Sequence, residues 1–231
     1  MNNPVINYIF KGIIIGDSNT GKSTITNVAI KNEKRNVATY DPTIGIEFGS
    51  RVVELRPNLK IKLYLWDTAG QESFRSIIRS YYRNISWVFL TYDVTRYRTF
   101  QNLYYWISEL HKYNNCKNHI HPIILIGTKI DKEGFRSVST EQGQQFADEN
   151  NMIFIETNAL YSEGMEKIII DLTNNVYNNL IDNGIDDNIL CSGIKLQMRE
   201  KMHLPNGGVR CDAFNIPQIN KDIQTKKLCC D

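Results

Sequence analysis

Long apolar runs are absent from this sequence of 231 residues; the longest are only about the length of a strand. A membrane-spanning helix, which needs roughly 20 apolar residues, is therefore not expected. Charge of one sign is also lacking, with 27 Lys and Arg against 25 Asp and Glu, so composition indicates no nucleic-acid-binding face. Cysteine is scarce: the chain has five cysteines, an odd number that cannot all pair with one another, and they show no metal-ligand spacing. No secretory signal segment is recognisable either, and we expect a reducing, cytosolic compartment.

Hydrophobic residues make up 42% of the chain, which is enough for one sizeable core. Strand-like segments rich in β-branched and aromatic residues occur at 8–15, 46–55, 61–66, 87–92, 123–127 and 153–156. Apolar residues recur at helical spacing between 100 and 110 and between 165 and 180. This alternation predicts an α/β fold with a six-stranded, mostly parallel sheet covered on both faces. A turn at 55–59 predicts that the second strand is antiparallel and lies at the edge.

The character of the sequence changes near residue 181. Residues 182–231 contain scattered Gly, Pro, Asn and charged residues without a sustained period. We therefore predict a folded domain at 1–181 and a flexible tail at 182–231, with at most a helical turn or two within 190–204. A second small domain is not expected, because the tail has too few apolar residues for a core.

A glycine-rich phosphate-binding loop, GDSNTGKS at residues 16–23, directly follows the first strand. Backbone N–H groups and a helix N-terminus would meet there and hold a polyphosphate. Lys22 would reach the β- and γ-phosphates, and the Ser23 hydroxyl would ligate Mg²⁺. The expected phosphate-binding residues are Gly16, Asp17, Ser18, Asn19, Thr20, Gly21, Lys22, Ser23 and Thr24, together with Gly70 further along the chain.

A second motif, WDTAGQE at residues 66–72, follows the third strand. The carboxylate of Asp67 could hold Mg²⁺, usually through water, and the Gly70 N–H could meet a γ-phosphate. Gln71 is then the candidate catalytic residue, because it would orient the attacking water. Thr43, between the loop and the second strand, could complete the Mg²⁺ shell with its hydroxyl.

The third motif is TKID at residues 128–131, directly after the fifth strand. The carboxylate of Asp131 can accept hydrogen bonds from both N1–H and the exocyclic amino group of guanine, whereas adenine offers no such pair. A paired polar contact of this kind discriminates strongly between bases. We therefore expect GTP and GDP as ligands. A P-loop ATPase or kinase would leave TKID and DTAGQE together unexplained.

With these motifs the chain resembles a small GTPase of the Ras superfamily, and within it a Rab. Rab-like segments, specific as a set, are IGIEF at 44–48, KLYLW at 62–66, FRSI at 74–77, YYR at 81–83 and LTYDVT at 90–95. The resemblance covers about residues 8–180. It implies the three-layer P-loop NTPase fold of a small G domain.

The resemblance also implies a monomeric GTP/GDP switch that hydrolyses GTP slowly, with Gln71 serving hydrolysis. Residues 156–159 resemble the ETSA segment, whose alanine N–H meets the guanine carbonyl. Implied partners are an exchange factor, a GTPase-activating protein, effectors, and a GDP-dissociation inhibitor or prenylation escort protein. The implied Mg²⁺ ligands are Ser23, Thr43 and Asp67. The implied guanine-site residues are Thr128, Lys129, Asp131, Asn158, Ala159 and Leu160.

The guanine motifs depart from the usual pattern at three positions. Thr128 replaces the usual asparagine and Leu160 the usual lysine, two variations similar to the Rho branch and compatible with guanine binding. A Rho assignment is not favoured, because no long extra helix fits between Asp131 and Glu156. Asn158 stands where serine is usual, which changes the side-chain hydrogen bonding available to that loop.

The segment before Thr43 departs further from the family. Relatives place an aromatic residue seven positions before the threonine, against the guanine, but this chain has Asn36. By analogy with aromatic pairs, its loss should cost on the order of 1 kcal/mol of base binding. We therefore expect faster nucleotide release than in ordinary Rab proteins. An alternative interpretation follows: a fast-exchanging, GTP-loaded interaction module with little hydrolysis.

The phosphate loop contains no arginine, and the sequence points to no other cis arginine finger. Hydrolysis should therefore be slow alone and accelerated by roughly 10³–10⁵-fold by a partner that inserts an arginine. Phe48, Trp66 and Tyr81 fall where relatives present an aromatic patch to effectors, although they could equally be core residues.

Two adjacent cysteines, Cys229 and Cys230, lie one residue from the end of the given sequence. In a polar tail they have no core to join, and in the Rab context they resemble a double prenylation site, although C-a-a-X spacing is not met. Two lipid chains would anchor the protein stably, and Lys226 and Lys227 would add a small attraction to anionic lipid. The expected location is the cytosolic face of endomembranes in a eukaryotic cell, in exchange with cytosol, with a role in vesicle trafficking.

Overall fold

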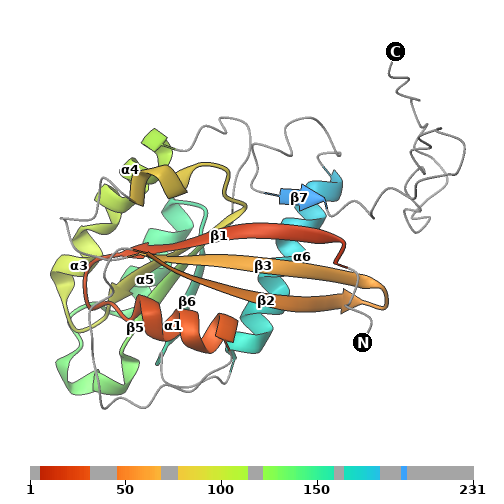
Figure 1. Ribbon diagram of the computed structural model, residues 1–231. Coiled ribbons are helices and arrows are strands. Elements are labelled where there is room, and N and C mark those ends of the chain that lie inside the picture. The colour runs from red at the N-terminus through yellow and green to blue at the C-terminus, as the bar shows by residue number, and fades with distance from the viewer. Residues whose placement is uncertain are drawn as a thin grey trace, which may run out of the picture. The chain divides into compact units, whose positions relative to one another are not determined.

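The computed structural model describes residues 6–31, 46–68, 78–113, 122–158, 164–182 and 194–196 (Figure 1). All of them lie in a compact unit that runs from Met1 to Gln197. The strands are β1 (Tyr8–Gly16), β2 (Ile46–Arg56), β3 (Leu59–Thr68), β4 (Trp87–Asp93), β5 (Ile123–Thr128), β6 (Ile153–Thr157) and β7 (Ile194–Leu196). The α-helices are α1 (Lys22–Thr26), α3 (Tyr97–Gln101), α4 (Leu103–Tyr113), α5 (Thr140–Glu149) and α6 (Met165–Asp182). Shorter helical segments are the π-helix η1 (Asn27–Lys31) and the 3₁₀ helices η3 (Arg79–Tyr82) and η4 (Ile130–Phe135).

The six predicted strands form one sheet in the order β2-β3-β1-β4-β5-β6. Only β2 runs antiparallel to its neighbour in this series, and it lies at the edge, as the sequence predicted. The turn between β2 and β3 contains Asn58 at φ 69°, a left-handed conformation that asparagine tolerates better than most residues. The fold prediction of a mostly parallel α/β sheet is confirmed.

Two hydrophobic clusters cover the two faces of the sheet and give it three layers. Alternate residues of β4 point to opposite faces: Trp87 and Phe89 join one cluster, and Val88 and Leu90 join the other. The first cluster is closed by apolar residues of α1, η1 and α6, and the second by η3, α4 and α5. Because both faces are buried, these strands appear in the sequence as continuous apolar runs instead of alternating ones.

The helices largely follow the predicted periodicity. The segment predicted at 100–110 is divided into α3 and α4, and the segment at 165–180 is the single helix α6. α5 begins with a capping box, in which Ser139 and Gln142 bond each other's backbone N–H groups. None of the helices in the described part of the chain is long and apolar enough to span a bilayer.

The predicted boundary between folded domain and flexible tail needs a correction. Residues 194–196 form β7, which pairs antiparallel with Tyr8, Ile9 and Phe10 of β1. Helical turns were predicted around this position, and for these three residues that prediction is wrong. The physical reason is a gap in the ladder: β4 pairs with β1 only from Gly12 onward, which leaves the first part of β1 with backbone groups to satisfy on that side.

Candidate nucleotide-binding site

The loop between β1 and α1 has the backbone of a phosphate cradle. Gly16 has φ 144°, and a Cβ built there would lie 2.4 Å from both the carbonyl oxygen and the hydroxyl of Thr91. Gly21 has φ 86° and is the N-cap of α1. Both positions require glycine, for conformation and, at Gly16, for space. The N-terminus of α1 therefore opens directly from the loop, where N–H groups can meet an anion.

Side chains tie this loop to the sheet and to α4. The Thr20 hydroxyl, fully buried, lies 2.7 Å from the Thr91 hydroxyl and donates to the carbonyl oxygen of Asp17 at 3.0 Å. The Asp17 carboxylate accepts hydrogen bonds from Asn102 Nδ2 at 2.7 Å and from the indole Nε1 of Trp106 at 2.9 Å. Asp17 and Thr20 were predicted to be phosphate-binding residues. In the structure, their side chains fix the shape of the phosphate loop.

Lys22 lies in the first turn of α1, with its Nζ inside the loop. It donates to the carbonyl oxygen of Asp17 at 2.7 Å, and only 6% of the residue is exposed. Burial lowers the pKa of Lys22 to about 8, although the negative charges of Asp67 and Asp17 oppose the decrease. A polyphosphate in the loop would place further negative charge beside this ammonium group and favour its protonated form.

Asp67 lies near the carboxyl end of β3, which extends two residues beyond its predicted limit at 66. Its backbone is the register partner of Ile14 in β1, and its side chain is fully buried. The negative charge of Asp67 acts to raise the pKa of Lys22 in the phosphate loop, so the two charges are close enough to interact. Ser23 follows Lys22 at the start of α1, so its hydroxyl and the Asp67 carboxylate come from two different elements.

These two groups fit Mg²⁺ bound to a nucleotide. No cluster of three or more His, Cys, Asp or Glu side chains that could hold a metal occurs within the described ranges. Mg²⁺ at a nucleotide does not need one, because phosphate oxygens and water complete the shell around one or two protein ligands. Ser23 and Asp67 would supply these protein ligands. The third predicted ligand, Thr43, lies outside the described residues.

The TKID motif lies at the end of β5 and the start of η4. The Thr128 hydroxyl is fully buried and donates to the carbonyl oxygen of Tyr92 at 2.8 Å, so it supports the backbone of the motif. Lys129 has φ 65° and directs its Nζ to within 2.7 Å of Asp93 Oδ2. Asp131 is exposed and makes no hydrogen bond or ion pair with the described residues. Its carboxylate is therefore available to a base.

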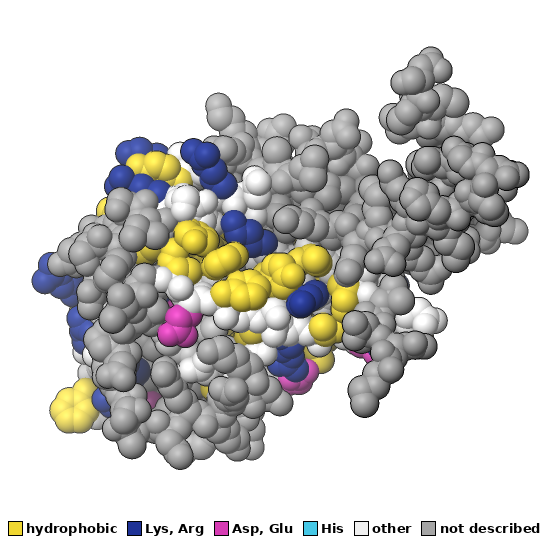
Figure 2. All heavy atoms as spheres, viewed as in Figure 1, with side chains coloured by type: hydrophobic (Ala, Val, Ile, Leu, Met, Phe, Trp, Pro, Cys, Tyr) yellow, Lys and Arg dark blue, Asp and Glu magenta, His cyan; other side chains and the backbone are white. Residues whose placement is uncertain are grey.

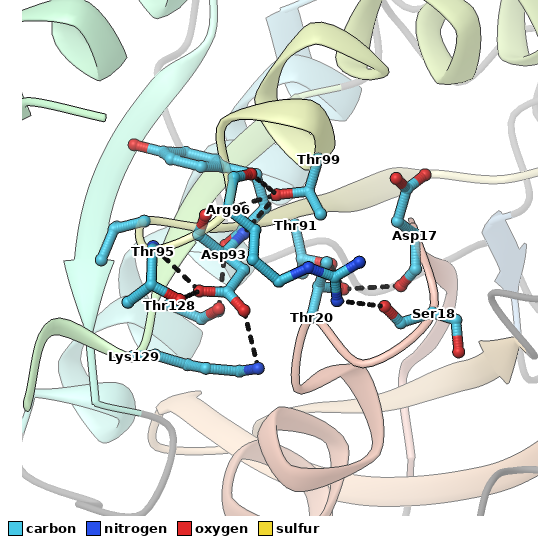
Figure 3. Close-up of polar contacts among 12 residues, drawn as sticks. Asp17, Ser18, Thr20, Thr91, Asp93, Thr95, Arg96, Thr99, Thr128 and Lys129 are labelled. Atoms are coloured by element: carbon cyan, nitrogen blue, oxygen red, sulfur yellow. Dashed lines mark hydrogen bonds and ion pairs between the residues drawn. The ribbon is translucent and has the colours of Figure 1, made fainter. Parts of the chain in front are cut away.

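A hydrogen-bonded segment at the end of β4 lies between the base motif and the phosphate loop (Figure 3). The fully buried Asp93 carboxylate binds Lys129 and accepts from the backbone N–H and hydroxyl of Thr95 at 2.9 and 2.7 Å. Thr99 donates its hydroxyl to the carbonyl oxygen of Arg96 at 2.8 Å. Arg96 in turn extends to the carbonyl oxygen of Ser18. In the sequence, residues 90–95 were distinguished only as a Rab-like segment. The contacts of Asp93 with Lys129 and of Arg96 with Ser18 could not be predicted, because they join residues far apart in the chain.

A second ion pair supports the loop after β6. Arg136 binds both carboxylate oxygens of Glu156, at 2.7 and 3.1 Å, and Thr140 donates to the same carboxylate at 3.0 Å. This bidentate pairing fixes the strand end that leads into Asn158. Sequence reasoning identified the ETNA segment but not its partner Arg136.

Several predicted site residues lie outside the described part of the chain, and their roles stay predictions. The structure thus brings together residues 16–24, Asp67, and 128–131, each from the end of a different strand. The residues outside the described ranges are Thr43, Gly70, Gln71, Ala159, Leu160, Cys229 and Cys230.

A sheet of this topology, with a glycine loop between its first strand and helix and a carboxylate at the next strand end, defines the class of P-loop nucleoside-triphosphate-binding proteins. A family model described as Ras family matches residues 11–178 of the chain. The match covers well over half of the sequence, and the chain therefore belongs to the Ras family. It is a small GTPase that binds guanine nucleotides as a switch.

Proposed function

We propose that this Ras-family protein is a Rab-type switch, which hydrolyses GTP and recruits effectors in its GTP form to regulate vesicle and membrane trafficking. The observation that carries the proposal is the convergence of three strand ends: the phosphate loop after β1, Asp67 on β3, and the exposed Asp131 after β5. These groups match, in order, the phosphates, Mg²⁺ and guanine of a single nucleotide. The Rab assignment rests on the sequence segments that resemble this branch.

An exposed aromatic surface supports the assignment to the Rab type. Phe48 is 47% exposed, and its ring centroid lies 4.9 Å from that of Trp66, which lies 4.8 Å from Tyr81. Trp66 and Tyr81 are only partly buried, so the three rings form a continuous surface instead of a core. Figure 2 shows apolar side chains gathered on this face across the strands of the sheet, with Lys and Arg side chains among them. An effector could bind this surface by stacking on these rings and burying them.

Catalysis would depend on positioning and on neutralising charge. The phosphate-loop N–H groups and Lys22 would orient the β- and γ-phosphates, and Gln71 would orient the attacking water. Mg²⁺, held by Ser23, Thr43 and Asp67, would supply positive charge at the phosphates. The segments around 37–45 and 69–82 would order around the γ-phosphate and relax after hydrolysis, and effectors would read that difference.

The deciding experiment measures nucleotide binding, release and single-turnover GTP hydrolysis on the purified protein, with and without a Rab-type GTPase-activating protein. We expect GTP and GDP to bind in an Mg²⁺-dependent manner, ATP not to compete, and the activating protein to accelerate hydrolysis. Gln71→Leu should keep GTP bound, and Ser23→Asn should favour the GDP or empty form. GTP affinity that remains Mg²⁺-dependent and unchanged in Ser23→Asn would contradict the site assignment.

The same experiment decides between the switch and a fast-exchanging interaction module. Rapid GDP release combined with little stimulated hydrolysis would favour the module. Release at the rate of ordinary Rab proteins would contradict the expectation based on Asn36.

A further inference from the structure

One arginine lies against the phosphate loop, although the loop sequence contains none. Arg96 follows β4, and its Nη1 donates to the carbonyl oxygen of Ser18 at 3.4 Å across 78 residues of chain. Figure 3 shows its guanidinium reaching from the end of β4 to the loop, beside Thr20 and Ser18. The 3.4 Å separation is longer than a typical N–H···O bond of 2.7–3.2 Å. This contact is therefore weak and easily exchanged for a stronger acceptor.

The backbone that carries Arg96 is firmly held. Its N–H donates to the carbonyl oxygen of Asp93 at 2.9 Å, and its own carbonyl accepts from both the backbone N–H and the hydroxyl of Thr99, at 2.9 and 2.8 Å. Asp93 is anchored by Thr95 and Lys129. The backbone at Arg96 is therefore held beside the loop, and the exposed side chain has room to bond to another acceptor there.

The positive charge of Arg96 is not neutralised by the described residues. None of their carboxylates forms an ion pair with it. Asp17 and Asp93 have other partners: Asp17 accepts from Asn102 and Trp106, and Asp93 binds Lys129 and Thr95. A guanidinium with five N–H donors and no acidic partner among the described residues, held at a phosphate loop, is suited to bind phosphate oxygens.

We infer that Arg96 supplies in cis the positive charge that stabilises the phosphates of GTP during hydrolysis. This inference rests on the proposed function in that GTP must be the ligand. In the reaction, water oxygen bonds to the γ-phosphorus while the bond to the β–γ bridging oxygen breaks. Its electron pair stays on GDP, and the protons of water pass to inorganic phosphate and solvent. Arg96 is unchanged chemically; its charge offsets the negative charge that develops on the phosphate oxygens.

The test compares four variants with the wild type: Arg96→Ala, Arg96→Lys, Arg96→Gln and, as a matched control, Arg98→Ala. Arg98 is an exposed arginine two residues away on α3, and its side chain forms no hydrogen bond or ion pair with the described residues. Single-turnover hydrolysis of preloaded GTP is measured without any activating protein. Removal of the charge should slow it about tenfold or more, by comparison with G proteins that carry their arginine in cis. Arg96→Lys should retain part of the rate, and Arg98→Ala all of it.

A second readout does not depend on turnover. Fluoroaluminate bound beside GDP imitates the transferring phosphoryl group, and its binding needs the charge that stabilises the transition state. Fluorescence of a labelled GDP should report complex formation by the wild type alone and by Arg98→Ala, and its loss in Arg96→Ala and Arg96→Gln. Thermal unfolding of the GDP-bound variants checks that all remain folded.

Three outcomes would overturn the inference. Unchanged hydrolysis and fluoroaluminate binding in Arg96→Ala would leave no role for the charge. Full activity in Arg96→Gln, whose amide can still donate to Ser18, would show that the side chain only holds the loop. Wild-type protein that binds no GTP would overturn the proposed function as well, so the two failures are distinguishable.

Discussion

At the residue scale, the shape of the phosphate loop depends on polar side chains that bond to other parts of the protein. Asp17 is the clearest case, because its backbone carbonyl accepts from Lys22 while its carboxylate accepts from Asn102 and Trp106 on the α3–α4 segment. One residue therefore couples the loop to the helical layer. Thr20 does the same toward the sheet through Thr91.

We predict that Asp17→Asn destabilises the protein by about 1.5–3 kcal/mol, the usual contribution of hydrogen bonds to a charged group. The amide oxygen can accept one bond, but its NH₂ group would face a second donor. GDP release should also become faster, because the loop loses its anchor to α4. Urea unfolding in saturating GDP and stopped-flow release of labelled GDP measure the two effects.

The matched control for this change is Asp171→Asn on α6. Asp171 is exposed, and its side chain forms no hydrogen bond or ion pair with the described residues, so its substitution should change neither quantity. Equal stability of the Asp17→Asn and Asp171→Asn proteins would refute the anchoring role.

A second residue-scale prediction concerns the pH dependence of stability at Asp93. Burial raises the pKa of this carboxyl, but the hydrogen bonds from Lys129 and Thr95 outweigh it and hold the pKa below its usual value. The folded pKa is thus lower than the unfolded one, near 3.9. The stabilisation is present above the unfolded value and is lost as the pH falls through the folded pKa.

Asp93→Asn should therefore be more destabilising at pH 7 than at pH 3. Urea unfolding of wild type and variant at pH 7, 5 and 3 measures the difference directly, with Asp171→Asn again expected to show little change at any pH. A destabilisation by Asp93→Asn that is constant across this range would show that packing, and not charge, is what Asp93 contributes.

At the scale of secondary-structure elements, β7 pairs with the part of β1 that β4 does not reach. β1 pairs with β3 along most of its length, but β4 reaches only its second half, and β7 occupies the remaining edge. A covered edge leaves fewer unpaired N–H and C=O groups that could pair with another chain.

Hydrogen exchange tests this pairing. Peptides covering residues 6–11 should exchange more slowly in the full chain than in a chain ending at Asp182, the last residue of α6. Peptides covering β4 provide the internal control, because β7 does not pair with that strand. Identical exchange of residues 6–11 in both proteins would contradict a stable β7.

At the same scale, the sequence predicted those strands and helices whose residues form a local hydrophobic pattern. The runs at 8–15 and 87–92 are continuous and apolar because both faces of the sheet are covered, and β1 and β4 begin within a residue of the predicted starts. The contacts of Trp106 and Arg96 with the loop were not predictable, since they depend on how helices pack across 78 or more residues. A strand of three residues such as β7 carries no period that could reveal it.

At the scale of the whole molecule, the nucleotide switch and the proposed lipid attachment site belong to different parts of the chain. The nucleotide site and the aromatic surface lie in the unit that ends at Gln197, whereas the paired cysteines belong to residues 198–231. We propose that the cysteines that would carry lipid and the aromatic surface that would bind effectors have separate roles. Nucleotide state would then change effector binding, while the cysteines would determine membrane binding.

The corresponding prediction is that Cys229 and Cys230 each carry a prenyl group in a eukaryotic cell. One chain gives only marginal, reversible membrane binding, whereas two chains anchor stably. Single Cys→Ser variants should therefore be shared between membrane and cytosol, and the double variant should be cytosolic. Cys211→Ser, in the same 198–231 unit, should remain with the membrane fraction. Mass spectrometry of the C-terminal peptide together with fractionation decides the matter: unmodified Cys229 and Cys230 on membrane-bound protein would show that another feature of the chain holds it there.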